Sequence, residues 1–320
     1  MSERVARATR RPVPFLTPPI ALCRPMALCY LPTTLCYPIG MSILSIQSAV
    51  SYGYVGNSVA VPALQRLGCE VWRIDTVALS NHPGHGAHQG SARPPAELSA
   101  LLDGMQRLDL LADCQAVVSG YLGAAGTAEV IVDAVASVRS ATSGPLYICD
   151  PVIGDDGRVF VEPDTAAAIR DRLVPMADIL TPNLFELGWL TGRPEDQPGE
   201  IIDAARDLVE RGPTSVIVTG VRQGDMIGAV LVDADGASAA MAPRCDRSFN
   251  GTGDLFTALI AGWLVKSKSR LEALALAVAG LDVVTRATER AGRRELDLIG
   301  ALPAIVDPDM ERVSLRSYRA

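Results

Sequence analysis

Lysine is almost absent from this chain of 320 residues, in which only Lys266 and Lys268 occur. Both follow a long apolar run and would lie in solvent at the end of a helix. A phosphate-binding loop of the Walker type needs a lysine directly after its second glycine, and a pyridoxal-phosphate enzyme needs a pocket lysine for its Schiff base. The sequence contains no Walker loop, and its two lysines are poor Schiff-base candidates.

Three further absences narrow the class of protein. None of the 7 cysteines pairs with another in a C-x-x-C motif, which is typical of reduced thiols and favours a cytoplasmic protein. After residue 40, no apolar run is long enough to cross a bilayer. The formal net charge is −7, so we expect neither nucleic acid nor a membrane as a partner.

The first forty residues differ in composition from the rest of the chain. They carry five arginines against one glutamate, together with seven prolines and three cysteines. Basic residues before an apolar stretch are also typical of a targeting peptide, but so many prolines break any continuous helix. We therefore predict a disordered basic extension over residues 1–40, a single α/β domain over 41–305 and a tail over 306–320.

From Met41 onward, short apolar strands alternate with amphipathic helices. This alternation predicts a doubly wound α/β domain with a mostly parallel central sheet and helices on both faces. Strands are expected over 43–47, 70–74, 116–119, 146–149, 178–180 and 215–218, and a hairpin joins 228–233 to 237–242. Helices are expected over 57–67, 97–111, 128–138, 164–173, 184–190, 200–210, 255–265 and 271–291.

A polar residue stands at or just beyond the end of five of these strands: Ser48, Tyr121, Asp150, Asn183 and Thr219. Ligands of doubly wound sheets bind beyond the carboxyl ends of the parallel strands. One such residue would mean little, but five on successive strands predict a single site.

The sequence Asn250-Gly-Thr-Gly-Asp254 directly precedes the long apolar run over 255–265. Gly251 and Gly253 allow a tight turn with exposed backbone N–H groups, and the start of a helix behind them favours an anion. A carboxylate repels phosphate, so Asp254 makes sense there as a base that takes a proton from an attacking hydroxyl. The alternative is an aspartate that caps the helix after a glycine turn.

Oxygen ligands gather in two further segments. Asp150 and Asp155 share one strand-end loop, and Asn183 and Glu186 lie one helical turn apart. Such hard ligands suit Mg²⁺, which keeps several waters and bridges phosphates. The alternatives are a helix cap for Asn183 and a first-turn acid for Glu186.

All three histidines, His82, His85 and His88, fall within one glycine-rich loop. A three-histidine zinc site is conceivable, but no acid lies nearby in the sequence to orient such ligands. A mobile lid over a bound ligand is the better interpretation.

The order of these motifs resembles the pyridoxal kinases of the ribokinase superfamily. The resemblance covers about residues 42–300, and its Ser-Ile-Gln-Ser and Ser-Asn-His segments are specific to the pyridoxal branch. The motifs are Ser45-Ile-Gln-Ser48, Gly53-Tyr-Val-Gly-Asn57, Ser80-Asn-His82, Ser119-Gly-Tyr121, Cys149-Asp-Pro-Val152, Thr181-Pro-Asn183 with Glu186, and Gly251-Thr-Gly-Asp254.

The resemblance implies a ribokinase-like fold, a homodimer, and ATP-dependent phosphorylation of the 5′-hydroxyl of pyridoxal, pyridoxine or pyridoxamine. It makes Asp254 the general base and the N–H groups of Gly251 to Gly253 the anion hole. The implied substrate pocket contains Ser48, Val55, His82, Pro83, Tyr121 and Asp254. The implied nucleotide site contains Asp150, Thr181, Asn183, Thr219, Gly220, Gly251, Thr252 and Gly253. Asp150, Asp155 and Glu186 would hold Mg²⁺ or its waters.

The chain departs from the family pattern in the lid. Pro83 replaces the usual threonine, which removes a hydroxyl and an N–H group near the substrate, and Ala87-His88-Gln89 stands where an aromatic residue is usual. Thr219-Gly220 stands where some relatives carry a lysine. Two alternatives therefore stay open: a hydroxymethylpyrimidine kinase of the same superfamily, and a non-catalytic protein that binds vitamin B6.

Overall fold

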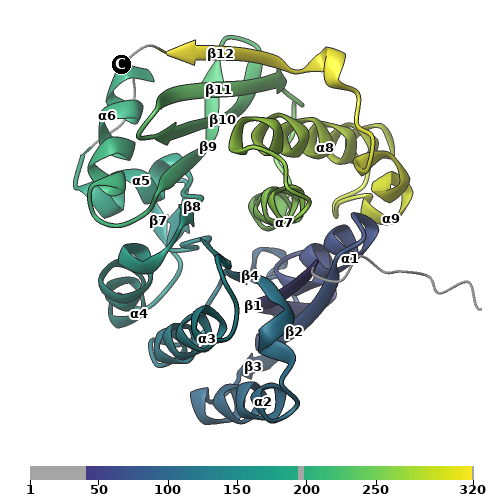
Figure 1. Ribbon diagram of the computed structural model, residues 1–320. Coiled ribbons are helices and arrows are strands. Elements are labelled where there is room, and N and C mark those ends of the chain that lie inside the picture. Colours follow the sequence, from purple (N-terminus) through teal and green to yellow (C-terminus); the bar gives the residue numbers. More distant parts are fainter. Residues whose placement is uncertain (1–40, 194–197, 319–320) are drawn as a thin grey trace, which may run out of the picture. The chain divides into compact units, whose positions relative to one another are not determined.

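The computed structural model describes residues 41–193 and 198–318, so the predicted extension over 1–40 lies outside the described residues. The strands, in chain order, are β1 (Ser42–Tyr52), β2 (Glu70–Asn81), β3 (Gly90–Ala92), β4 (Cys114–Ser119), β5 (Leu146–Cys149), β6 (Gly154–Asp155), β7 (Arg158–Val159), β8 (Ile179–Leu180), β9 (Ser215–Gln223), β10 (Met226–Asp233), β11 (Gly236–Pro243) and β12 (Ser314–Tyr318). Within the described residues, ten of them form one sheet in the order β12-β11-β10-β9-β8-β5-β4-β1-β2-β3 (Figure 1).

Six adjacent strands of this sheet, from β9 to β2, are parallel, and antiparallel strands extend it at both ends. The helices are α1 (Asn57–Arg66), α2 (Pro95–Arg107), α3 (Thr127–Ala141), α4 (Pro163–Ala168), α5 (Leu184–Thr191), α6 (Pro198–Val209), α7 (Thr252–Val265), α8 (Arg270–Arg290) and α9 (Leu298–Ala301). The predicted doubly wound fold with a mostly parallel sheet is confirmed.

Two apolar cores lie on opposite faces of the sheet. Helices α2 to α6 pack on one face, and α1, α7, α8 and α9 pack on the other (Figure 1). Every residue of α7 from Leu255 to Trp263 is buried, which explains why its sequence is apolar on all sides rather than on one. The helix that follows the glycine motif is therefore held firmly between the sheet and its neighbours α1 and α8.

Three strands run several residues past their predicted ends, and one of them, β9, continues to Gln223. β1 continues to Tyr52, and β2 continues to Asn81, where the sequence had indicated only a short strand and then a loop. The register between the two strands shifts between Gln47 and Ala49. The added part of β1 is partly exposed and lacks an apolar run, so its pattern did not indicate a strand.

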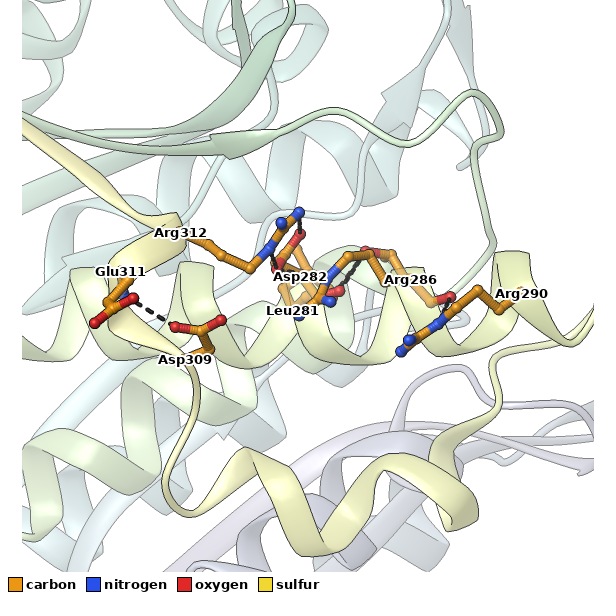
Figure 2. Close-up of polar contacts among 8 residues, drawn as sticks. Leu281, Asp282, Arg286, Arg290, Asp309, Glu311 and Arg312 are labelled. Carbon is orange, nitrogen blue, oxygen red and sulfur yellow. Dashed lines mark hydrogen bonds and ion pairs between the residues drawn. The ribbon is translucent and has the colours of Figure 1, made fainter.

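The C-terminal segment contains a strand that the sequence did not predict. β12 pairs with β11 at the edge of the sheet, and its alternation is too short and polar to stand out from a loop. Just before it, Arg312 reaches α8 and donates from Nε to the buried carboxylate of Asp282 over 2.8 Å, as Figure 2 shows. Arg286 donates to the same oxygen over 2.8 Å. This paired charge fastens the segment to α8.

No helix among residues 41–193 and 198–318 combines the length and the apolar character that a bilayer span requires.

Candidate active site

The five polar strand-end residues lie along one edge of the sheet, as the sequence predicted. Strands β1, β4, β5, β8 and β9 are consecutive and parallel, so their carboxyl ends face the same way. Ser48 lies within β1 and Thr219 within β9, because both strands extend beyond their predicted ends. The other three are Tyr121, Asp150 and Asn183, which follow β4, β5 and β8.

The glycine motif forms the start of α7. Gly251 is the residue that precedes the helix, with a φ of 82°, and no side chain caps the first turn. The backbone N–H groups of that turn therefore have no capping side chain, and N–H groups at the start of a helix favour an anion. Asp254 lies inside the first turn, so the alternative that it caps the helix is wrong.

A glycine is required at position 251 for a second reason. A Cβ atom there would collide with the backbone carbonyl of Tyr54, which belongs to the turn between β1 and α1. The glycine motif and this turn, residues 53–56, thus pack backbone against backbone. Their close approach brings the N–H group of Gly56 to the carboxylate of Asp254.

The carboxyl group of Asp254 has a raised pKa. Burial is the cause, and the hydrogen bond from the Gly56 N–H acts in the opposite direction by favouring the charged form. Gly56 itself has a φ of 52° and packs against Ser48, whose hydroxyl a Cβ atom at 56 would strike. One turn therefore connects the candidate base to Ser48.

Asp150 lies beneath the glycine motif. The hydroxyl of Thr257, one helical turn after Asp254, donates to the Oδ2 atom of Asp150 over 3.1 Å, and Thr257 shares a second hydrogen bond of 2.9 Å with the hydroxyl of Thr181. Burial, followed by the charges of Glu186 and Asp254, raises the pKa of Asp150 well above its usual value. Positive charge beside Asp150 would act in the opposite direction and favour its charged form, so a cation would bind favourably there.

Asn183 and Glu186 form a capping box at the start of α5. The Asn183 side chain accepts from the Glu186 N–H over 2.8 Å, and Glu186 Oε2 accepts from the Asn183 N–H over 3.0 Å. Glu186 Oε1 accepts from the N–H groups of Ile153 and Gly154. Burial raises the pKa of Glu186 to about 7. Both oxygens of Glu186 already accept hydrogen bonds from backbone N–H groups. The contacts of Asn183 and Glu186 are therefore those of a helix cap and a first-turn acid, the alternatives that the sequence left open for them.

Asp155 is exposed on the β6–β7 hairpin and accepts a hydrogen bond from the N–H of its neighbour Asp156 over 2.8 Å. Across the described part of the chain, no three histidine, cysteine or acidic side chains stand close enough together to hold a metal ion. Asp150, Asp155 and Glu186 do not form a metal cage on their own. The three histidines of the lid do not form a zinc site either.

The residues that the sequence predicted for the nucleotide continue along the edge at β9. Thr219 donates its N–H to the carbonyl of Pro182 over 2.8 Å and forms a parallel bridge with Asn183. Gly220, with a φ of 74°, and Thr252 complete the predicted set. The Thr252 hydroxyl donates to the Phe249 carbonyl over 3.1 Å.

The residues that the sequence predicted for the substrate lie at the neighbouring strands β1 and β4. Ser48 and Val55 are buried, and Tyr121 is half-buried. The Thr76 hydroxyl fixes the backbone of Tyr121 by donating to its carbonyl over 2.6 Å. These residues hold one wall of the site in place.

The lid, residues 82–89, joins β2 to β3. Pro83 begins a short 3₁₀ turn, and His82 Nδ1 accepts from the Gly84 N–H over 3.1 Å. A Cβ atom at Gly84 would stand 3.6 Å from the side-chain nitrogen of Asn250. The lid therefore reaches the glycine motif, and burial and the neighbouring His85 lower the pKa of His82.

No role was predicted from the sequence for two residues at this site, Asn57 and Glu295. Asn57 accepts from the Ser45 hydroxyl over 2.7 Å and donates to Asp75 over 2.8 Å, so it joins β1, α1 and β2. Its place after Gly-Tyr-Val-Gly was the signal. Glu295 lies in the turn after α8 and contacts both the lid and the 53–56 turn. No local pattern marks it.

Residues 104–297 match the family model described as phosphomethylpyrimidine kinase. The pyridoxal kinase PdxY of Rubrobacter xylanophilus is 41% identical over 84% of this chain and 95% of that protein. The pyridoxal kinase PdxY of Deinococcus radiodurans is 43% identical over 81% of this chain and 91% of that protein.

Among solved structures, the chain is similar to the pyridoxal kinase of Leishmania donovani in complex with ADP and pyridoxamine. The TM-score is 0.81 at 28% sequence identity, and the match covers 87% of this chain and all of the other. That relative therefore binds a nucleotide and a B6 vitamer on the same fold.

Proposed function

The chain belongs to the pyridoxal kinase family, and we propose that it transfers the γ-phosphoryl group of ATP to the 5′-hydroxyl of pyridoxal. Pyridoxine and pyridoxamine carry the same hydroxyl and are further substrates. The relatives named pyridoxal kinase and the ADP-bound Leishmania structure support the kinase activity and the use of ATP. The product is pyridoxal 5′-phosphate, so the reaction is a step of vitamin B6 salvage.

The observation that carries this proposal is the placement of Asp254. Its carboxylate lies in the first turn of α7, beside the free N–H groups of the glycine motif and within reach of the Gly56 N–H. There, Asp254 takes the proton of the 5′-hydroxyl as the oxygen attacks the γ-phosphorus. The new P–O bond forms as the bond to the β-phosphate oxygen breaks, and ADP leaves.

The glycine motif stabilises the charge on the transferred group. N–H groups of Gly251, Thr252 and Gly253 point toward the phosphoryl oxygens, and the positive end of the α7 dipole adds to their effect. Donors fixed by packing cost no reorganisation during the reaction. The buried α7 and the contact between Gly251 and Tyr54 supply that rigidity.

One buried carboxylate of this site, that of Asp150, suits Mg²⁺. The carboxylate of Asp150 is buried, and its pKa is raised by burial and by nearby negative charges, so a cation would relieve it. Mg²⁺ commonly uses one or two carboxylates and completes its shell with water and phosphate oxygens. When bound with ATP it would neutralise phosphate charge. Asp150 would contact it or its waters, whereas Glu186 acts through the field of its charge and Asp155 remains a weaker candidate.

The remaining site residues are proposed to bind the two substrates. Thr181, Asn183, Thr219, Gly220 and Thr252 line the nucleotide side. Ser48, Val55, His82, Pro83 and Tyr121 surround the vitamer, and Ser48 faces its polar edge. Because Pro83 offers neither a hydroxyl nor an N–H group, the lid has fewer donors for the substrate, which bears on the choice of vitamer.

A hydroxymethylpyrimidine kinase is the second candidate function, because the matching family model carries the phosphomethylpyrimidine kinase description. The test is ADP release from ATP with pyridoxal, pyridoxine, pyridoxamine and hydroxymethylpyrimidine measured side by side. We expect the highest kcat/KM with a B6 vitamer. A higher value with hydroxymethylpyrimidine would overturn the assignment, and no turnover with any substrate would favour the non-catalytic B6-binding alternative, against which the intact Asp254 and glycine motif argue.

We further propose a cytoplasmic homodimer. Cys69, Cys114 and Cys149 are free and buried, and burial raises their pKa values to about 11, 11 and 12. Such thiols resist oxidation and suit a reducing compartment. The homodimer rests on family resemblance, and light scattering of the purified protein tests it.

A further inference from the structure

Glu295 is a buried carboxylate with two separate contacts at the rim of the site. Its side chain is 10% exposed. One oxygen, Oε2, accepts the backbone N–H of Tyr54 over 3.3 Å. The other, Oε1, lies 2.6 Å from Nε2 of His85 in the lid, off the axis of a straight hydrogen bond. Neither atom of that pair makes a hydrogen bond to any other described group, so this close polar contact is the one that each of them has.

The contact with Tyr54 fixes the turn between β1 and α1. A Cβ atom at Gly53 would strike the Glu295 carboxylate, and one at Gly251 would strike the Tyr54 carbonyl. The turn is therefore held between Glu295 on one side and the glycine motif on the other. Its last residue, Gly56, supplies the N–H group that contacts Asp254.

The contact with His85 fixes the lid. The His85 side chain is 9% exposed, and its ring lies near those of Tyr52 and His82, with centroid distances of 6.0 Å and 6.3 Å. The Asn81 side chain closes the base of the lid by donating to the carbonyls of His82 and Ala87. The lid thus approaches the glycine motif at Asn250 while Glu295 holds its middle.

We propose that Glu295 is a positioning residue that sets two parts of the site at once. Through Tyr54 it places the Gly56 N–H against the general base, and through His85 it holds the lid over the vitamer. This inference rests on the proposed kinase function. In this proposal Glu295 acts through Tyr54 and His85.

The two contacts can be separated by substitution. Glu295→Gln keeps an oxygen that accepts the Tyr54 N–H but removes the charge that faces His85, whereas Glu295→Ala removes both contacts. His85→Ala removes only the lid contact. Glu272→Gln is the matched control, because Glu272 also accepts a backbone N–H, that of Ser269 over 3.0 Å, but at the opposite end of α8.

Hydrogen exchange of the substrate-free protein tests whether Glu295 fixes the lid and residues 53–56, and it does so independently of activity. We expect Glu295→Ala to lose protection in both the lid and residues 53–56, and His85→Ala to lose it in the lid alone. Glu272→Gln should leave both segments as in the wild type. Unchanged exchange of both segments in Glu295→Ala would overturn the proposal whatever the enzyme phosphorylates.

Kinetics then separate a positioning role from a general structural one. We expect Glu295→Gln and His85→Ala to raise the KM for pyridoxal by roughly 3- to 10-fold with little change in the KM for ATP, since losing one close polar contact to a charged group weakens binding on about this scale. Glu295→Ala should also lower kcat by about 10- to 100-fold, because small misplacements of reacting groups are costly. The double variant of His85→Ala with Glu295→Gln should resemble either single variant.

Open lids admit water, so ATP hydrolysis without transfer should increase in Glu295→Ala. Wild-type KM values for both substrates in every variant, or fully additive effects in the double variant, would overturn the positioning role. Failure of the wild type to phosphorylate any vitamer would overturn the proposed kinase function instead, and the exchange result would still decide whether Glu295 fixes the two segments.

Discussion

The hydroxyl of Thr257 donates to the carboxylate of Asp150 over 3.1 Å, and this bond joins the end of β5 to the helix that carries Asp254, the proposed general base. Thr257 follows Asp254 by three residues on α7, so both side chains lie on the same side of that helix. The two acids are thereby fixed close enough for the charge of Asp254 to raise the pKa of Asp150.

Replacing the proposed general base, Asp254, should affect chemistry more than binding. We expect Asp254→Asn to lower kcat by about 10²- to 10⁴-fold, the usual contribution of a positioned base, with ATP affinity nearly unchanged. Steady-state kinetics and calorimetric titration with ATP measure the two effects. Asp235→Asn, in the exposed β10–β11 turn, is the control and should keep wild-type kinetics. Near-normal turnover of Asp254→Asn would contradict the assignment.

Removing the charge of Asp150 should stabilise the folded protein and raise its requirement for Mg²⁺. An uncharged amide relieves the repulsion that Glu186 and Asp254 exert on Asp150 and can still accept the Thr257 hydroxyl. We therefore expect Asp150→Asn to unfold at a higher temperature than the wild type and to need more Mg²⁺ for half-maximal activity. Calorimetry and a Mg²⁺ titration of the rate check this. A lower unfolding temperature combined with an unchanged Mg²⁺ requirement would refute it.

Glu186 should make the folded state less stable as pH rises. Its pKa is about 7 in the folded protein, against an ordinary value of 4.5, so the folded chain binds more protons than the unfolded chain between these values. Its contribution to stability is therefore fully present below about pH 4.5 and is lost as pH rises to about 7. Urea unfolding at several pH values measures the slope, and Glu186→Gln should reduce it. An equal slope in that variant would show that another group is responsible.

The C-terminal segment should depend on Arg312. Arg312→Met leaves the buried Asp282 with Arg286 as its only remaining ion-pair partner among the described residues. We expect unfolding free energy to fall by about 1–3 kcal/mol, since a buried charge loses part of its compensation, while kcat stays unchanged. Arg316→Met, exposed on β12, is the control and should change stability by less than about 0.5 kcal/mol. A stability equal to the wild type would contradict this account of Figure 2.

Local sequence was sufficient for much of the fold and for the edge where the site lies. The apolar strand over 146–149 and the polar residue after it, Asp150, were both visible because a buried parallel strand and its exit are short-range features. The strand over 314–318 was not, since pairing with β11 rather than its own pattern makes it a strand. The same limit applies to Glu295, whose partners Tyr54 and His85 are remote in the sequence.

The sequence was also ambiguous where the same residue type can either bind a ligand or cap a helix. Asn183 and Glu186 were predicted as nucleotide and metal groups, with a capping role as the alternative. The structure shows the capping box, because the unpaired N–H groups at the start of α5 are satisfied by the nearest side-chain oxygens. Asn183 and Glu186 can cap α5 and also lie beside a proposed nucleotide site. Their spacing in the sequence is the same in both cases, so it could not tell the two roles apart.

The bond between Tyr54 and Glu295 spans 241 positions of the chain. During synthesis, the β1–α1 turn therefore emerges long before the carboxylate that fixes it. A nascent chain that ends before Glu295 contains the glycine motif and Asp254, yet lacks the contact that holds the turn and the lid. The contact between Glu295 and this turn is consequently one of the last to form in making the protein, and partial chains released early would carry the glycine motif without it.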